Sequence, residues 1–122
     1  MNQPLTIAVI GAGSAGRDFA VASAAAGFRV ILEDVMPDKL RSAALDFARI
    51  GREVTLVSTV EDAVREADVV VDFVPDELES KLEIWSMIDR MAPPRTIMAV
   101  AISTKSRLRS DRPMMALSMA GA

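Results

Sequence analysis

Short apolar runs alternate with longer amphipathic segments along most of this chain. The short runs are rich in β-branched residues with few polar residues between them, which is typical of strands buried on both faces. We expect strands at residues 5–10, 29–33, 54–57, 68–73 and 96–101. The longer segments have helical spacing and predict helices at residues 14–26, 37–50, 59–66 and 77–91. Alternating strands and helices predict parallel strands joined by right-handed crossovers.

Turn and cap residues fall where these helices should begin and end. Gly27 and Gly51 follow the first two helices, at the position of a C-terminal cap. Pro37 suits the first position of the second helix. Thr59 and Asp62 have the spacing of a capping box, which predicts the start of the third helix.

Helical spacing also predicts which side chains face the core. In the second helix, the apolar face consists of Leu40, Ala44, Phe47 and Ile50. In the fourth helix, the apolar stripe consists of Leu78, Leu82, Trp85 and Ile88. Both helices are therefore expected to pack one face against the sheet.

Composition and charge exclude several classes of protein. Hydrophobic residues make up 51% of the 122 residues and charged residues 25%, which excludes an intrinsically disordered chain. The net charge of −3 argues against general nucleic-acid binding. The sequence contains no cysteine, so thiolate metal sites, disulfides and cysteine nucleophiles are excluded. It also contains no histidine, the commonest general base and metal ligand. We expect no metal site.

The first sixteen residues carry no charged side chain, as the apolar part of a signal peptide would. The basic region that precedes such a part is missing, however, and glycines at 11, 13 and 16 interrupt the stretch. No run reaches the roughly 18 apolar residues that a spanning helix needs. We expect a soluble, cytoplasmic protein without membrane contact.

A glycine-rich turn follows the first predicted strand and opens the first predicted helix. Its residues match G-x-G-x-x-G: Gly11, Ala12, Gly13, Ser14, Ala15 and Gly16. In this context the motif predicts dinucleotide binding. Gly11 allows the tight turn, Gly13 admits a pyrophosphate close to the backbone, and Gly16 permits close helix packing. The helix N-terminus offers unpaired N–H groups to the phosphates. A glycine-rich turn that binds nothing is the alternative.

Asp34 ends the second strand, 18 residues after Gly16. A carboxylate there can accept hydrogen bonds from the adenosine ribose and repels a 2′-phosphate. The following residues, 35–37, supply no arginine for such a phosphate, so the sequence favours NAD over NADP. The alternative is that Asp34 or Glu33 is an ordinary acid near the start of a helix. An FAD site has a similar turn and acid, but nothing else indicates a flavin domain.

Together these features predict the α/β class, with a Rossmann-type doubly wound parallel sheet in three α/β/α layers and a single domain. Residues 1–104 form the expected NAD-binding domain, and residues 105–122 form a C-terminal extension. The apolar segment 114–122 is either a sixth strand or the place where a longer protein has been cut.

The segments around the fourth helix narrow the field further. Residues 71–81 (VDFVPDELESK) and 92–94 (APP), with 9–16 (VIGAGSAG), resemble the NAD-binding domain of the 3-hydroxyacyl-CoA dehydrogenase family. The resemblance covers residues 5–104. It implies an oxidoreductase of fatty-acid metabolism that transfers hydride between a 3-hydroxyacyl-CoA and NAD.

The resemblance also implies further cofactor contacts. Phe73 and Val74 would line the cofactor cleft, and Asp76 and Lys81 match an acid and a lysine near the nicotinamide half. Ser103 matches a serine that contacts substrate and nicotinamide. Asp76 has an alternative role as an acid that offsets the helix dipole, and Lys81 as the solvated partner of a neighbouring glutamate. Ser103 has an alternative role as a strand-end hydroxyl bonded to local backbone.

Two features of the family are missing from this chain. The family uses a histidine, paired with a glutamate, to remove the proton of the 3-hydroxyl, and a separate helical domain to cover the acyl chain and supply dimer contacts. This sequence has no histidine and stops before that domain would begin. We therefore expect NAD(H) binding with little or no turnover, no catalytic residue in this chain, and apolar surface that drives formation of a homodimer.

Other functions remain open. The basic residues of the C-terminal extension either meet the phosphates of an acyl-CoA or form a solvated loop; they are Lys105, Arg107, Arg109 and Arg112. The chain itself is alternatively a non-catalytic module that binds or senses NAD, or the cofactor domain of another β-hydroxyacid-type dehydrogenase.

Overall fold

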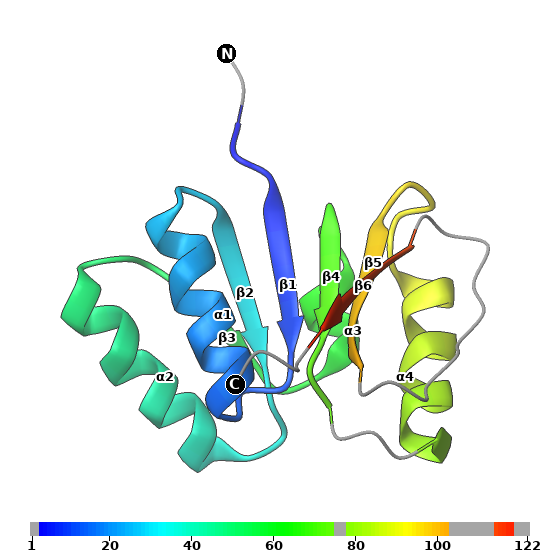
Figure 1. The fold of residues 1–122 in the computed structure, drawn as a ribbon, viewed down its shortest axis with the longest axis horizontal. Coiled ribbons are helices and arrows are strands. Elements are labelled where there is room, and N and C mark those ends of the chain that lie inside the picture. The colour runs from blue at the N-terminus through cyan, green and yellow to red at the C-terminus, as the bar shows by residue number, and fades with distance from the viewer. Residues whose placement is uncertain (1–2, 75–77, 103–113, 119–122) are drawn as a thin grey trace.

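A computed structural model describes residues 3–74, 78–102 and 114–118. Within these residues, six strands form one parallel sheet in the order β3-β2-β1-β4-β5-β6 (Figure 1). Their bounds are β1 Thr6–Ile10, β2 Arg29–Glu33, β3 Thr55–Val57, β4 Val69–Asp72, β5 Ile97–Ile102 and β6 Met114–Ser118. This is the Rossmann strand order, in which the direction of winding reverses between β1 and β4. The predicted fold class is confirmed.

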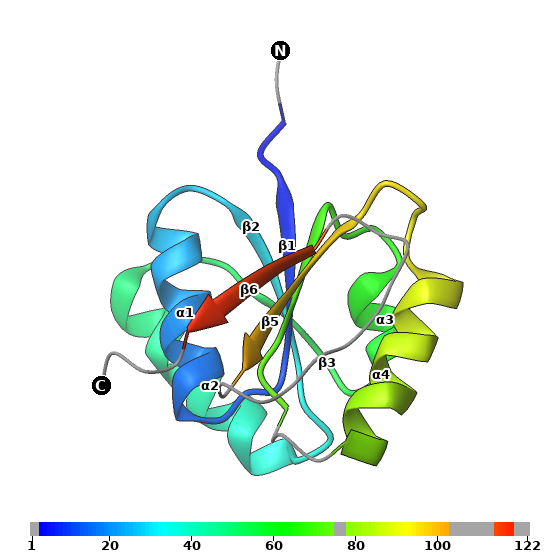
Figure 2. The same cartoon turned by 45° about the vertical axis from the view of Figure 1, so that its right-hand side comes forward.

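Helices cover both faces of the sheet and give it the predicted three layers (Figures 1 and 2). The helices are α1 Ser14–Ala25, α2 Pro37–Ile50, α3 Val60–Val64 and α4 Leu78–Met91. α1 and α2 pack on one face and α3 and α4 on the other. Side chains alternate along β1 between the two cores: Ile7 and Val9 face α1 and α2, whereas Ala8 and Ile10 face α3 and α4.

The predicted helix ends agree with the structure. Gly27 and Gly51 have φ angles of +98° and +65°, a conformation that side chains disfavour, and each follows its helix. Pro37 begins α2. The Thr59 hydroxyl accepts a hydrogen bond from the Asp62 backbone N–H at 3.1 Å and so caps α3.

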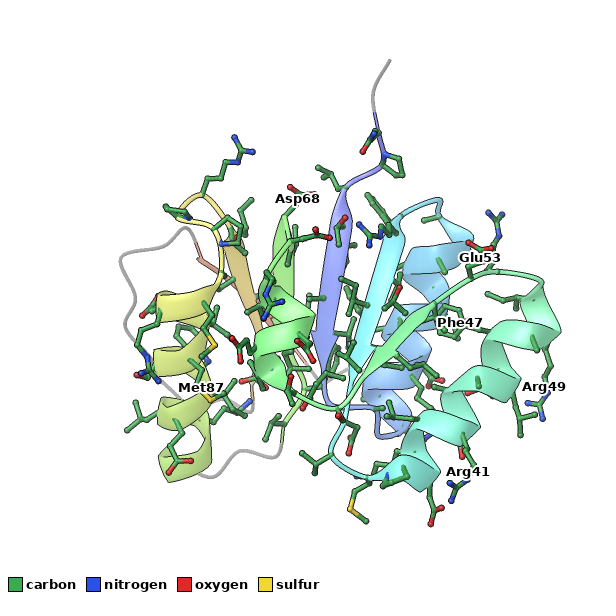
Figure 3. The ribbon with its side chains drawn as sticks, turned by 180° about the vertical axis from the view of Figure 1, so that it is seen from behind. Arg41, Phe47, Arg49, Glu53, Asp68 and Met87 are labelled. Carbon is green, nitrogen blue, oxygen red and sulfur yellow. The ribbon has the colours of Figure 1, made fainter. Side chains whose placement is uncertain are left out.

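The predicted apolar face of α2 is wrong in part. Phe47 is buried between α2 and the sheet (Figure 3). Ala44 and Ile50 are exposed, and Ala43 is buried instead. Leu40 and Ala43 lie seven and four residues before Phe47, so these three share one stripe of the helix. Ala44 lies on the adjoining stripe and faces solvent.

The predicted stripe of α4 needs a similar correction. Trp85 and Ile88 are buried, but Leu82 is 51% exposed, while Lys81 is only 1% exposed. The side chain of Leu78 lies outside the described part of the structure. The position four residues before Trp85 faces the sheet, and Lys81 occupies it because a carboxylate on β4 pairs with its ammonium.

In the described ranges, no helix is long and apolar enough to cross a membrane.

Candidate functional site

The glycine-rich turn lies at the carboxyl edge of the sheet, where β1, β2 and β4 end side by side. The Gly11 backbone N–H donates to the Glu33 carbonyl oxygen at 2.8 Å, and the Phe73 N–H donates to the Ile10 carbonyl oxygen at 2.7 Å. These bonds join the end of β1 to the ends of both neighbouring strands. Because the winding reverses between β1 and β4, this edge is where open α/β sheets bind ligands.

The three glycines of the turn differ in the space that surrounds them. Gly11 has a φ of +100°, and a Cβ there would lie 3.2 Å from the Phe73 carbonyl carbon. A Cβ on Gly16 would overlap the Gly11 carbonyl oxygen, so α1 starts in direct contact with the turn. A Cβ on Gly13 would meet nothing within 4 Å. The turn is therefore closed toward the protein at Gly11 and Gly16 and open at Gly13, as the approach of a phosphate requires.

Asp34 connects the glycine turn to the end of β2. Its Oδ2 accepts the Ala12 backbone N–H at 2.8 Å, and its Oδ1 accepts the Met36 N–H, also at 2.8 Å. The carboxylate is buried. Each carboxylate oxygen accepts one backbone N–H and has a second lone pair that can accept a hydrogen bond from a ligand hydroxyl. Asp34 does not cap α2, whose N-cap is Met36.

Arg17 is a residue at this edge that the sequence did not single out. It follows Gly16 on α1, and its Nη1 donates to the Ala12 carbonyl oxygen at 3.1 Å. Its Nε donates to Oδ2 of Asp46 on α2 at 3.3 Å. No local motif marks this arrangement, because its partners come from the crossing of two helices.

A buried ion pair joins α4 to the last residue of β4. The Lys81 Nζ is 3.2 Å from Asp72 Oδ2, and both side chains are almost completely buried. Asp72 Oδ1 accepts the Val74 N–H at 2.8 Å, so the same carboxylate shapes the start of the following segment. Lys81 is not a solvated side chain, and that alternative is wrong. Its role as a cofactor contact stays a prediction.

Glu33 adds a second buried acid on the same side of the sheet as Asp72. Burial raises the pKa of Glu33 from 4.5 to about 7, and the negative charges of Asp34 and Asp72 act in the same direction. The Gly11 backbone N–H partly opposes this effect on the pKa. Glu33 is therefore a group that exchanges a proton near neutral pH beside the proposed ribose position.

The structure brings together most of the residues predicted for cofactor binding. The glycine turn, Asp34, Phe73 and Val74 meet at the carboxyl edge, where the Phe73 ring packs on Phe19 with ring centres 5.4 Å apart. Asp76, Ser103 and the four basic residues of the extension lie outside the described residues. In the described ranges, no cluster of three acidic, histidine or cysteine side chains could hold a metal ion.

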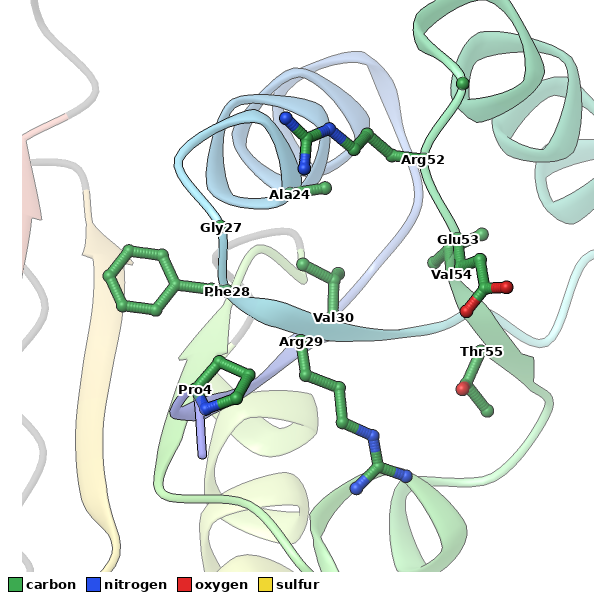
Figure 4. Close-up of a pocket in the computed structure, with 11 residues that line it drawn as sticks. Pro4, Ala24, Gly27, Phe28, Arg29, Val30, Arg52, Glu53, Val54 and Thr55 are labelled. Atoms are coloured by element: carbon green, nitrogen blue, oxygen red, sulfur yellow. The ribbon is translucent and has the colours of Figure 1, made fainter. Parts of the chain in front are cut away.

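A separate open hollow of about 840 Å³ lies at the opposite edge of the sheet (Figure 4). Its charged side chains do not converge. Arg52 extends over Ala24, whereas Arg29 points the other way and lies 3.6 Å from Glu66. This hollow therefore lacks the grouped polar atoms that fix a small ligand.

Comparison with known proteins agrees with the geometry of the carboxyl edge. Residues 2–101 match the family described as acetohydroxy acid isomeroreductase, NADPH-binding domain. The chain belongs to this family. It is thus an NAD(P)-binding Rossmann domain, and its relatives include several dehydrogenases.

Two curated relatives and one solved structure illustrate the kinds of enzyme that this chain resembles. A probable 3-hydroxybutyryl-CoA dehydrogenase of Bacillus subtilis (strain 168) is 30% identical over an aligned length of 111 residues; the match covers 76% of this chain and 38% of the relative. An alanine dehydrogenase of Mycobacterium tuberculosis (strain CDC 1551 / Oshkosh) is 32% identical over 114 residues, covering 91% of this chain and 31% of that protein. A diketoreductase structure superposes with a TM-score of 0.73 at 26% identity, covering 85% of this chain and 44% of that one.

The chain therefore spans about a third of the length of these curated relatives. They include a 3-hydroxybutyryl-CoA dehydrogenase, which is of the expected kind, but also an alanine dehydrogenase, and the family itself carries the name of an isomeroreductase. The resemblance to 3-hydroxyacyl-CoA dehydrogenases alone was thus too narrow: the relationship extends to a broader set of NAD(P)-dependent enzymes.

Proposed function

We propose that this chain is the NAD(H)-binding part of a dehydrogenase that acts on a 3-hydroxyacyl-CoA or a related hydroxy acid. The observation that carries the proposal is the hydrogen bond from the Ala12 N–H to Asp34 Oδ2, at 2.8 Å. It joins the glycine turn to the acid that we propose for the ribose, so that one dinucleotide can contact both. The pyrophosphate would lie along residues 11–16, and the adenosine ribose on Asp34.

The cofactor preference follows from the charge of Asp34. A buried carboxylate that still has free acceptor positions suits two ribose hydroxyls and repels a 2′-phosphate. Residues 35–37 carry no cation that would offset this repulsion. We therefore propose NAD as the cofactor, although the family is named for a domain that binds NADPH.

Oxidation of a hydroxyl group needs a proton acceptor, and this chain has no histidine to serve as one. A base must lie within hydrogen-bond reach of the substrate hydroxyl and have a pKa near the working pH. We propose that the acyl-CoA is bound jointly with a further polypeptide part, that the chain forms a homodimer, and that it works in the cytoplasm.

A non-catalytic module that binds or senses NAD is the second candidate, and the lack of histidine favours it.

Calorimetric titration with NAD and NADP tests the cofactor proposal. NAD should bind at least about tenfold more tightly than NADP, a difference of about 1.4 kcal/mol. Asp34→Ala should narrow this gap, whereas Glu53→Ala, at an exposed acid of the opposite edge, should preserve it. Equal affinities for both nucleotides in the unaltered protein would overturn the assignment, as would the lack of any binding.

A spectrophotometric assay with acetoacetyl-CoA and NADH tests the proposal that this chain supplies no catalytic base. The purified chain should bind NADH but give no detectable turnover, because loss of a positioned base alone costs about 10²–10⁴-fold. Turnover near one per second by this chain would contradict the argument and would require a base that we have not identified.

A further inference from the structure

Both backbone polar groups of Ala12, the second residue of the glycine turn, form hydrogen bonds with side chains. Asp34 Oδ2 accepts the Ala12 N–H at 2.8 Å, and the Arg17 guanidinium donates to the Ala12 carbonyl oxygen at 3.1 Å. Ala12 itself is completely buried. Two side chains, one directly after β2 and one on α1, thus fix the planes of the peptide units before and after Ala12.

The Arg17 contact fixes the direction of a neighbouring N–H group. In a planar trans peptide the carbonyl and the following N–H point in opposite directions. The Ala12 carbonyl points to Arg17, so the Gly13 N–H must point away from it. Gly13 precedes the first turn of α1, where N–H groups have no acceptor within the helix, and a Cβ on Gly13 would border open space.

Asp46 holds the guanidinium in this position. Its Oδ2 lies 3.3 Å from the Arg17 Nε, so a carboxylate on α2 both orients and neutralises the arginine. Arg49 also contacts Asp46, with its Nη1 3.3 Å from Oδ1, but it points outward from α2 into solvent (Figure 3). Because the charge of Arg17 is already paired, the residue acts as a hydrogen-bond donor to the turn.

We infer that Arg17 is a positioning residue, which orients the Ala12–Gly13 peptide so that the Gly13 N–H is directed at the pyrophosphate of the bound dinucleotide. The inference rests on the proposed function. A peptide that is already oriented costs less to order when the ligand arrives. Arg17 contributes in this way without contacting the ligand, and Asp46 contributes through Arg17.

The test uses a pair of ligands that differ in the pyrophosphate. ADP-ribose carries it, and adenosine does not. Arg17→Gln should weaken binding of ADP-ribose and NAD about tenfold, because the Gly13 N–H loses its fixed direction and its hydrogen bond to the anion weakens, and should leave adenosine binding unchanged. Arg49→Gln is the matched control, because it removes an ion pair of the same Asp46 without touching the turn; it should change neither affinity.

Two further measurements separate positioning from folding. Arg17→Lys should recover part of the ADP-ribose affinity, because one ammonium can reach the carbonyl but cannot bond Asp46 with the same fork geometry. Amide spectra of the free protein resolve the glycines well, since the sequence has only six. The Gly13 amide resonance should shift in Arg17→Gln, while the distant Gly51 resonance should not.

Each other result would overturn the inference. An equal loss for adenosine and ADP-ribose would indicate general damage to the site. Unchanged ADP-ribose affinity in Arg17→Gln, with normal binding by the unaltered protein, would refute the positioning role alone. Failure of the unaltered protein to bind either NAD or ADP-ribose would refute the proposed function together with this inference.

Discussion

Replacing Glu33 with glutamine should stabilise the fold at about pH 8 and remove most of its pH dependence between about pH 4.5 and pH 7. Glu33 is only 5% exposed, and burial together with the charges of Asp34 and Asp72 raises its pKa from 4.5 to about 7. As the pH rises through this window, the unfolded chain releases the proton while the folded chain keeps it. The folded protein therefore loses stability across the window and stays at the lower value above it.

The size of this effect follows from the two pKa values. A difference between 4.5 and about 7 corresponds to about 3 kcal/mol, which is a large share of the stability of a small domain. Glutamine imitates the protonated, uncharged acid, so Glu33→Gln should be more stable than the unaltered protein by up to about 3 kcal/mol at pH 8 and nearly equal to it at pH 4.5.

Urea unfolding followed by tryptophan fluorescence measures this directly, since the single tryptophan, Trp85, is buried in the core. Glu53→Gln is the control, because Glu53 is an exposed acid at the opposite edge and should keep the unaltered pH dependence. Parallel stability curves for Glu33→Gln and the unaltered protein between about pH 5 and pH 8 would refute the reasoning.

Two further substitutions test the packing of the site. Gly16→Ala should prevent normal folding, measured by circular dichroism, because the added Cβ would overlap the Gly11 carbonyl oxygen; a folded variant that binds NAD normally would contradict this. Lys81→Met should cost about 3–5 kcal/mol in urea unfolding, because it leaves the Asp72 carboxylate buried without its cation, and adding Asp72→Asn should restore part of the loss. An unchanged unfolding midpoint in Lys81→Met would show that the pair is not needed.

The fold was predictable because its signals are local. Apolar runs bounded by glycine, proline and a threonine cap define each element within a few residues, and alternation of strand and helix then leaves few topologies. The glycine turn was equally visible, because a strand must precede it and a helix must follow it for its conformation to be useful. Asp34 was found because its spacing from Gly16 is set by one helix and one strand.

The missed features depend on contacts between distant segments. On α4, periodicity alone cannot decide between the stripe through Leu82 and the adjacent one through Lys81, and the decision comes from Asp72 on β4. The bond from Arg17 to Asp46 spans 29 residues and exists only once two helices have packed. No local sequence signal distinguishes such an arginine from a solvated one.

The central claim is that a dinucleotide binds at the carboxyl edge of the sheet, across the glycine turn and Asp34. Amide resonances recorded during titration with NADH test it most directly. Resonances of residues 11–16 and 34–36 should shift together and saturate, while those of Phe28 and Arg52, at the hollow of the opposite edge, should stay in place. Shifts confined to Phe28 and Arg52, or no shift at saturating NADH, would contradict the account.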